Sequence, residues 1–225
     1  MRRTRLNVIT TVVLALTMGI LLLSGCNLQS TLVRGHGKMM SHSIQSDNFT
    51  GLNINGAYEL TFLQSPEYSV TLEIQENLFQ YVKVDVQDSV LQISNSVKFY
   101  TNARNTPRLI ISAPDLNSLD FYGAVIANMD LNVDILNVSL SGAGDVTLTG
   151  SANILDINNS GAASIKTYNM ISKDVSVSVT GAGIVEVFAS DTLDISISGV
   201  SMVRYDGDPQ LIQTVSGMGS IERRR

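Results

Sequence analysis

The chain has 225 residues and a formal net charge of −5, a length that allows one domain or two small ones. It contains a single cysteine, which excludes a disulfide framework. Every acidic residue lies after residue 25, so a chain without residues 1–25 carries 12 basic and 20 acidic residues, a net charge of −8. Such an acidic protein is not expected to bind nucleic acid.

The first 25 residues have the pattern of an export signal. Arg2, Arg3 and Arg5 precede an apolar run over residues 8–23, which is short for a membrane span and is followed by small residues. The run ends in Leu23-Ser24-Gly25-Cys26, which resembles the lipobox of bacterial lipoproteins. This resemblance implies that Cys26 receives a diacylglyceryl group and becomes the new N-terminus. The alternative is an uncleaved signal anchor with a chance cysteine.

A lipidated Cys26 would hold the protein at a membrane, since more than one acyl chain makes anchoring stable. Asn27 follows the cysteine, and in Gram-negative lipoproteins a residue other than Asp favours the outer membrane. Residues 26–43 have little pattern, and we expect the lipidated cysteine followed by a flexible tether. The only two histidines, His36 and His42, lie in this tether, where we interpret them as solvated residues and not as metal ligands.

Residues 44–115 are rich in short strand patterns of irregular spacing. Strands are expected over residues 49–55, 57–63, 68–74, 82–86, 90–93 and 109–111. Asn55-Gly56 and residues 65–67 are expected to be turns, and Gln87-Asp88-Ser89 a hairpin or corner turn. Residues 98–107 are polar and are expected to form a loop. No linker separates this half from the next, so residues 44–225 are predicted to be one domain.

Residues 116–225 contain a repeat in which a hydroxyl or aromatic residue precedes a glycine. The glycines are separated by 19, 19, 20, 18 and 18 residues, and an apolar or small residue always follows four positions later. A fixed period near 20 is typical of stacked units that bury their apolar faces against each other. The repeat glycines are Gly123, Gly142, Gly161, Gly181, Gly199 and Gly217.

The residue types between the glycines indicate strands. Val, Ile and Thr alternate with polar residues, for example over residues 136–148 and 193–205. Glycine suits a corner because it accepts positive φ and allows the next backbone to approach closely. We therefore predict an all-β, right-handed parallel β-helix-like solenoid with 18–20-residue rungs, whose N-terminal half is less regular. The alternative is a β-sandwich in which the glycines mark independent hairpin turns.

An ordered set of motifs is similar to the bacterial head-GIN domain family, whose lipoprotein-type members are described as putative autotransporter adhesin heads. The resemblance covers about residues 44–223 and implies a right-handed β-helical solenoid without established catalytic residues. Two corners depart from the pattern, since Ala163 and Ser201 replace its second glycine. The motifs that carry the resemblance are residues 76–78, 81–93, 113–116, 141–146, 205–209 and 216–221.

No set of residues predicts catalysis, a metal site or a cofactor site. A Ser-His-Asp triad needs a histidine, and none follows His42. Asp145, Asp206 and Asp208 are calcium candidates, but turn aspartates usually cap their own backbone. The hydroxyls of Ser141, Ser160, Ser198 and Ser216 are candidates for a hydrogen-bonded ladder along the coil.

Two functions of different classes remain compatible with the sequence. The first is a non-catalytic, lipid-anchored protein of the cell envelope that presents a rigid surface for adhesion or scaffolding, with an envelope protein or a neutral glycan as its partner. The second is a carbohydrate-active β-helix enzyme, a lyase or a hydrolase. Sparse positive charge disfavours the second, because Lys166, Lys173 and Arg204 are the only basic residues between residues 119 and 205.

Overall fold

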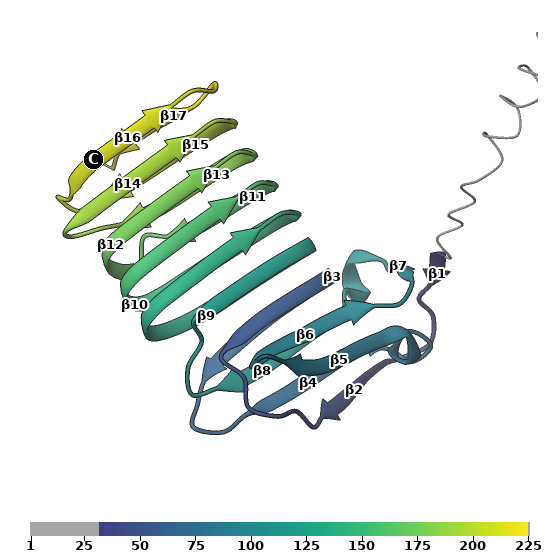
Figure 1. Ribbon diagram of the computed structural model, residues 1–225. Coiled ribbons are helices and arrows are strands. Elements are labelled where there is room, and N and C mark those ends of the chain that lie inside the picture. The colour runs from purple at the N-terminus through teal and green to yellow at the C-terminus, as the bar shows by residue number, and fades with distance from the viewer. Residues whose placement is uncertain (1–31, 225) are drawn as a thin grey trace, which may run out of the picture. The chain divides into compact units, whose positions relative to one another are not determined.

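The computed structural model describes residues 32–224, which form an all-β protein (Figure 1). This confirms the all-β part of the predicted fold class. No α-helix occurs in the described range, and its two short 3-10 helices are η1 (Phe79–Tyr81) and η2 (Ala103–Asn105). The strands are β1 (Leu32–Arg34), β2 (Met39–Ile44), β3 (Gly51–Gln64), β4 (Ser69–Gln75), β5 (Val82–Gln87), β6 (Val90–Asn95), β7 (Lys98–Tyr100), β8 (Arg108–Ala113), β9 (Ser118–Leu140), β10 (Ala143–Asn159), β11 (Ala162–Thr167), β12 (Met170–Val179), β13 (Ala182–Phe188), β14 (Thr192–Ile197), β15 (Val200–Asp206), β16 (Gln210–Val215) and β17 (Ser220–Arg223).

Fifteen of these strands form one sheet, which is not closed. Its centre is made by the long strands β3, β9 and β10, which pair in parallel. Beyond β10 the strands continue as two parallel series, β11-β13-β15-β17 and β12-β14-β16. The chain alternates between the two series, so each passage adds one strand to each of them, as the stacked ribbons in Figure 1 illustrate.

The strand register follows the sequence repeat. Ala124, Ala143, Ala162, Ala182 and Val200 each follow a repeat glycine, and they are consecutive partners in the parallel ladder. Because side chains alternate between the two faces of a strand, this register places equivalent repeat positions on the same face. The period of the sequence therefore determines which side chains lie over one another.

The core is built from columns of inward-facing aliphatic side chains. Val146, Ile165, Val185 and Val203 stand four residues after their repeat glycines, and all four are 0% exposed. The other series contributes equivalent columns, such as Leu155, Val175 and Leu193. Burying each such side chain stabilises the fold by about 1.5–3 kcal/mol relative to exposure.

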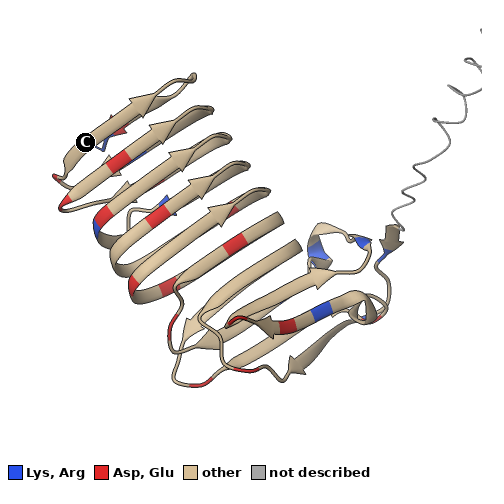
Figure 2. Cartoon of the chain, viewed as in Figure 1, with Lys and Arg blue, Asp and Glu red and all other residues tan. Residues whose placement is uncertain are grey.

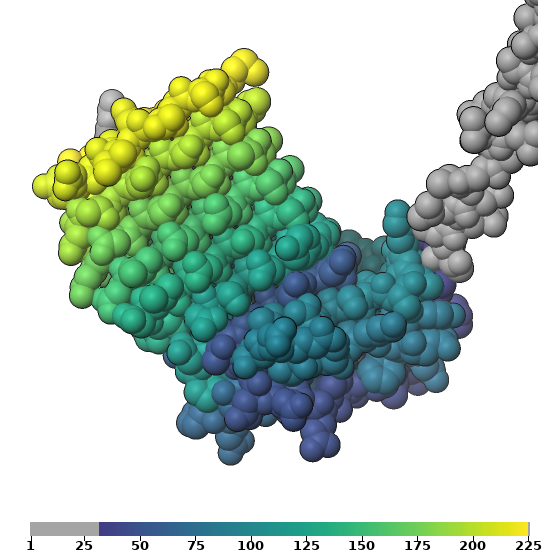
Figure 3. All heavy atoms as spheres, viewed as in Figure 1, coloured from purple at the N-terminus to yellow at the C-terminus, as the bar shows by residue number. Residues whose placement is uncertain are grey.

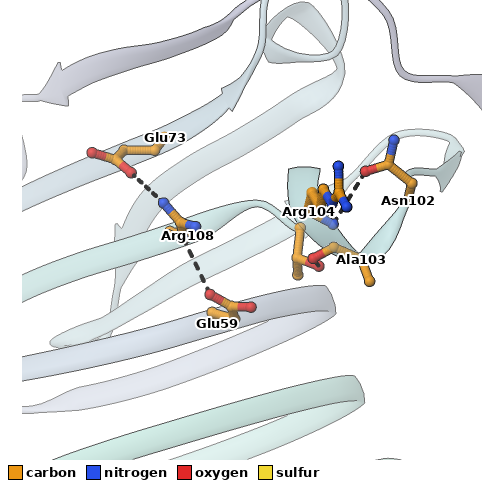
Figure 4. Close-up of polar contacts among 7 residues, drawn as sticks. Glu59, Glu73, Asn102, Ala103, Arg104 and Arg108 are labelled. Carbon is orange, nitrogen blue, oxygen red and sulfur yellow. Dashed lines mark hydrogen bonds and ion pairs between the residues drawn. The ribbon is translucent and has the colours of Figure 1, made fainter.

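The N-terminal part of the chain covers one end of these parallel series with antiparallel strands. Strand β4 pairs with β2 on one side and β8 on the other. Strands β5 and β6 form a hairpin through Asp88 and Ser89, both with positive φ, as the hairpin prediction at residues 87–89 requires. Arg108 on β8 lies between Glu59 on β3 and Glu73 on β4, at 3.2 and 3.4 Å (Figure 4).

Several N-terminal expectations need correction. The predicted tether over residues 26–43 contains β1 and most of β2, and the compact unit begins at Leu32. Within it His42 is not a solvated linker residue, because its ring stacks on Phe79 with the centroids 3.7 Å apart. These strands lack the repeat of the later chain and are held by pairing with β7 and β4, which lie far away in sequence.

Two other local predictions were wrong for a similar reason. Asn55-Gly56 does not form a turn, since both residues lie inside β3, which pairs with β9 along its length. The predicted loop over residues 98–107 contains β7 and η2. Asn102 caps η2 by accepting a hydrogen bond from the Arg104 N–H at 3.1 Å, a contact drawn in Figure 4. In each case partners distant in sequence determine the local structure.

Candidate functional site

The repeat glycines form a column in which the backbones approach too closely for side chains. A Cβ placed on Gly142 would overlap the carbonyl oxygen of Gly123, and the same relation recurs along the column. Gly142 does not have positive φ, so close approach alone requires glycine there. The column also includes Gly56, which the sequence pattern assigned to a turn. Its members are Gly56, Gly123, Gly142, Gly161, Gly181, Gly199 and Gly217.

Next to this column lies a shallow groove lined mainly by uncharged polar side chains. Its volume is about 290 Å³. Ser139, Asn158 and Ser178 are successive partners in the ladder, so their side chains project from the same face of adjacent strands. We call this the hydroxyl–amide groove, and it is lined by Tyr122, Ser139, Leu140, Ser141, Asn158, Asn159, Ser160, Ser178 and Thr180.

The backbone groups of the groove serines bond to the preceding strands. The backbone N–H groups of Ser141 and Ser160 donate to Phe121 and Leu140 on the preceding strands, at 3.0 and 2.9 Å. Within residues 32–224, however, no hydrogen bond joins the hydroxyls of Ser141, Ser160, Ser198 and Ser216 to one another, so the hydrogen-bonded serine ladder considered above is not formed. Ser216 Oγ instead donates to the Ile197 carbonyl at 3.5 Å.

Seven of the nine groove residues were not identified from the sequence as site residues, and Tyr122 and Asn159 are the most informative of them. The Tyr122 side chain is 43% exposed and supplies the groove's aromatic ring. Asn159 is 1% exposed and stabilises the backbone beneath the groove. Its Oδ1 accepts a hydrogen bond from the Gly161 N–H at 3.0 Å, and its Nδ2 donates one to the Ala182 carbonyl. In the sequence, Asn159 stands out only as the polar exception in an apolar column.

The three aspartates considered as calcium candidates, two of which lie in β10 and β15, contact cationic side chains or their own backbone. Lys166 pairs with Asp145 at 3.1 Å, and Arg223 pairs with Asp208 at 3.3 Å. Asp206 accepts a hydrogen bond from the N–H of the next residue, Gly207, at 2.8 Å. Within residues 32–224 no three His, Cys, Asp or Glu side chains are arranged to hold a metal ion.

A second, larger pocket of about 580 Å³ lies near the C-terminal strands. The Arg224 guanidinium lies 4.7 Å above the Tyr168 ring, and burial together with nearby Glu186 raises the pKa of Tyr168. Arg204 lies between Glu186 and Glu222, and Arg224 pairs with Asp206. Because acidic partners offset these arginines, the pocket offers no excess positive charge to an anion.

The wider charge distribution also shows no excess of positive charge. Acidic residues recur on successive strands of the parallel series, and basic residues are few in the view of Figure 2. The predicted lipidation residue Cys26 lies outside the described residues. Among residues 32–224 no helix has the length and hydropathy of a membrane span.

Several solved structures resemble this fold. A putative adhesin from Bacteroides fragilis has a TM-score of 0.67 and 21% identity, over 85% of this chain and all of that one. A putative adhesin from Parabacteroides distasonis gives 0.52 and 21%, over 86% of this chain and all of that one. A putative lipid binding protein from the same species gives 0.50 and 17%, over 87% of this chain and all of that one. At these identities the likeness shows the fold.

None of these names describes an enzyme. A search of curated proteins found no match. A family model, in contrast, matches residues 48–209, which is most of the sequence and includes the hydroxyl–amide groove. The chain therefore belongs to the family described as putative auto-transporter adhesin, head GIN domain.

Proposed function

We propose that this protein is a non-catalytic adhesion module of the cell envelope, anchored by a lipid on Cys26. Its adhesive part is a right-handed β-solenoid with rungs of 18–20 residues, on which the hydroxyl–amide groove contacts an extended neutral glycan. The observation that carries the proposal is this groove of exposed hydroxyls and amides beside Tyr122, in a member of an adhesin-head family.

The groove has the chemistry of a neutral sugar site. Hydroxyl and amide groups both donate and accept hydrogen bonds, as sugar hydroxyls do, and an aromatic ring offers an apolar face for sugar C–H groups. No charged side chain lines the groove. Equivalent side chains on adjacent strands are about 4.8 Å apart, so contacts repeat along an extended ligand. The overall negative charge disfavours an anionic polysaccharide.

The absence of a candidate nucleophile–base pair in the groove supports binding without chemistry. The chain has no histidine beyond His42, and its one cysteine is Cys26. No histidine, cysteine or lysine lines the groove. A general acid or base for glycoside hydrolysis would be a carboxyl group, and none lines the groove.

The anchoring part of the proposal is tested with Cys26→Ala in the full chain. We expect the variant to remain an unprocessed precursor without the lipid mass, while the wild-type protein carries a lipidated N-terminal cysteine. Mass spectrometry of the membrane fraction measures both. Identical processing and membrane release of the two proteins would contradict lipid anchoring.

The binding part is tested with a panel of neutral and anionic polysaccharides and the full chain in detergent. We expect saturable binding to a neutral polysaccharide, weakened at least tenfold by Tyr122→Ala. Tyr100→Ala is the matched control, because Tyr100 is an exposed tyrosine on β7 outside the groove. Equal weakening by both substitutions, or binding only to an envelope protein, would contradict the proposed glycan site.

A further inference from the structure

The two ends of the parallel series differ in how they are covered. Antiparallel strands from the N-terminal part cover one end, whereas β16 and β17 are the terminal strands at the other end (Figure 3). In residues 32–224, β14 is the only strand that pairs with β16, so one edge of β16 is unpaired. An unpaired edge presents backbone groups to which another strand can bond.

The hydrogen bonds of β16 show which of its backbone groups face this free edge. The N–H groups of Gln210 and Ser216 donate toward the β14 side, to Asp191 and Ile197 at 2.8 Å. Alternate residues of a parallel strand bond to the same neighbour, so positions 210, 212, 214 and 216 face β14. Positions 211, 213 and 215 therefore direct their N–H and C=O groups toward the free edge.

The side chains at these three positions continue the core columns to the end of the stack. Leu211, Gln213 and Val215 lie in register with Leu193, Ile195 and Ile197, which are buried. No further strand covers them in the described range, and Val215 is 45% exposed. Gln213 places an amide in a column that is otherwise aliphatic, after Val177 and Ile195.

The sequence of β16 is complementary to itself when two copies run antiparallel about Gln213. In that register Gln213 lies opposite Gln213 of the second copy, and Leu211 lies opposite Val215. The outward backbone groups of all three residues then form hydrogen-bonded pairs, and the two amides bond to each other. The strand Gln-Leu-Ile-Gln-Thr-Val contains no charge, proline or glycine that would oppose pairing.

Two other free edges fit a second strand less well. Strand β17 carries Glu222 and Arg223, and β5 carries Lys83 and Asp85. Charged edge residues are a common means of preventing strand addition, and β16 lacks them. From the free backbone groups, the exposed apolar end and the self-complementary register, we infer that β16 is a homotypic docking strand, which joins two copies of this chain end to end about a two-fold axis through Gln213.

This inference does not depend on the proposed glycan site, which lies on other strands. End-to-end pairing would place two hydroxyl–amide grooves in one assembly, each on its own copy. A dimer could then bind one long glycan, or two glycans, at both grooves and gain avidity from the linkage.

Disulfide cross-linking in membranes that contain the full chain tests the register. In Gln213→Cys the two Cα atoms would lie about 5.5 Å apart, within the range of a disulfide. In the matched control Gln210→Cys they would be six residues out of register, about 20 Å apart, because a strand rises about 3.3 Å per residue. We expect mild oxidation to give at least fivefold more covalent dimer with Gln213→Cys than with Gln210→Cys or the wild-type chain.

Sedimentation of the full chain in detergent provides a second measurement. Gln213→Lys places two like charges opposite each other and should abolish the dimer, whereas Gln210→Lys adds the same charge where it meets Ser216 of the second copy and should preserve it. Equal cross-linking of the two cysteine variants, or a wild-type chain that remains monomeric at every concentration, would overturn the inference. Loss of glycan binding in a protein that still dimerises would count only against the proposed function.

Discussion

Gly142 packs directly against the carbonyl oxygen of Gly123, with no room for a side-chain carbon between the two backbones. Gly142→Ala should therefore force the adjacent strands apart and lower the free energy of unfolding by about 1–3 kcal/mol. Ala143→Val is the control, since Ala143 is the exposed neighbour and a surface change there costs about 0.5 kcal/mol or less. Thermal unfolding measures both variants. An unchanged melting temperature for Gly142→Ala would show that the column tolerates a methyl group.

Asn159 and Asn158 are neighbours that face opposite sides of β10. Replacing Asn159 should therefore lower stability, whereas replacing Asn158 should weaken glycan binding. Asn159→Ala leaves the Gly161 N–H without its partner in a buried setting, so we expect a loss of about 1–3 kcal/mol. Asn158→Ala should leave stability within about 0.5 kcal/mol of the wild type and weaken glycan binding, because its side chain is exposed in the groove. Chemical denaturation and a binding titration of both variants check the pair. A stable Asn159→Ala variant with weakened binding, together with a destabilised Asn158→Ala variant that still binds, would contradict these two roles.

Tyr58 should make stability sensitive to alkaline pH. Its hydroxyl donates to Asn95 Oδ1 at 2.5 Å, and burial raises the pKa of Tyr58 above its ordinary value. The unfolded chain then loses this proton first, at about pH 10, so the contribution of Tyr58 is complete below pH 10 and declines as pH rises further.

Tyr58→Phe removes both the proton and the hydrogen bond. We expect the variant to be about 1 kcal/mol less stable at neutral pH and to lose less stability than the wild type between pH 9 and 11. Urea unfolding at a series of pH values gives both quantities. Parallel pH profiles for the two proteins would contradict the raised pKa.

The periodic part of the chain explains how much of the fold the sequence could predict. The spacing of Gly142, Gly161 and Gly181 anticipates which residues pair across β10, β11 and β13, because repeat position and strand register coincide. Gly56 belongs to the same column, but residues 65–117 lie between β3 and β9 and interrupt the period. A period cannot be recognised across an insertion longer than two repeats.

The N-terminal strands and the groove depend on information that the local sequence does not carry. Strands β1 and β2 form because β7 and β4 offer partners, and nothing near His42 indicates such pairing. The sequence does point to the serines that precede the repeat glycines, but it suggests that their hydroxyls bond to one another in a ladder. In the structure, Ser141 and Ser160 instead line a groove beside Tyr122. Their position there depends on how adjacent strands stack, which the sequence does not specify residue by residue.

Binding and turnover measured in one experiment decide between an adhesion module and an enzyme. The full chain is incubated with the neutral polysaccharide that it binds best, and bound polymer, reducing ends and unsaturated sugars are measured over time. We expect saturable binding that Tyr122→Ala weakens at least tenfold and Tyr100→Ala preserves, with the polymer unchanged in length. Release of reducing ends or unsaturated sugars by the wild-type protein, lost on substitution of a single aspartate, would contradict non-catalytic adhesion and identify a carbohydrate-active enzyme.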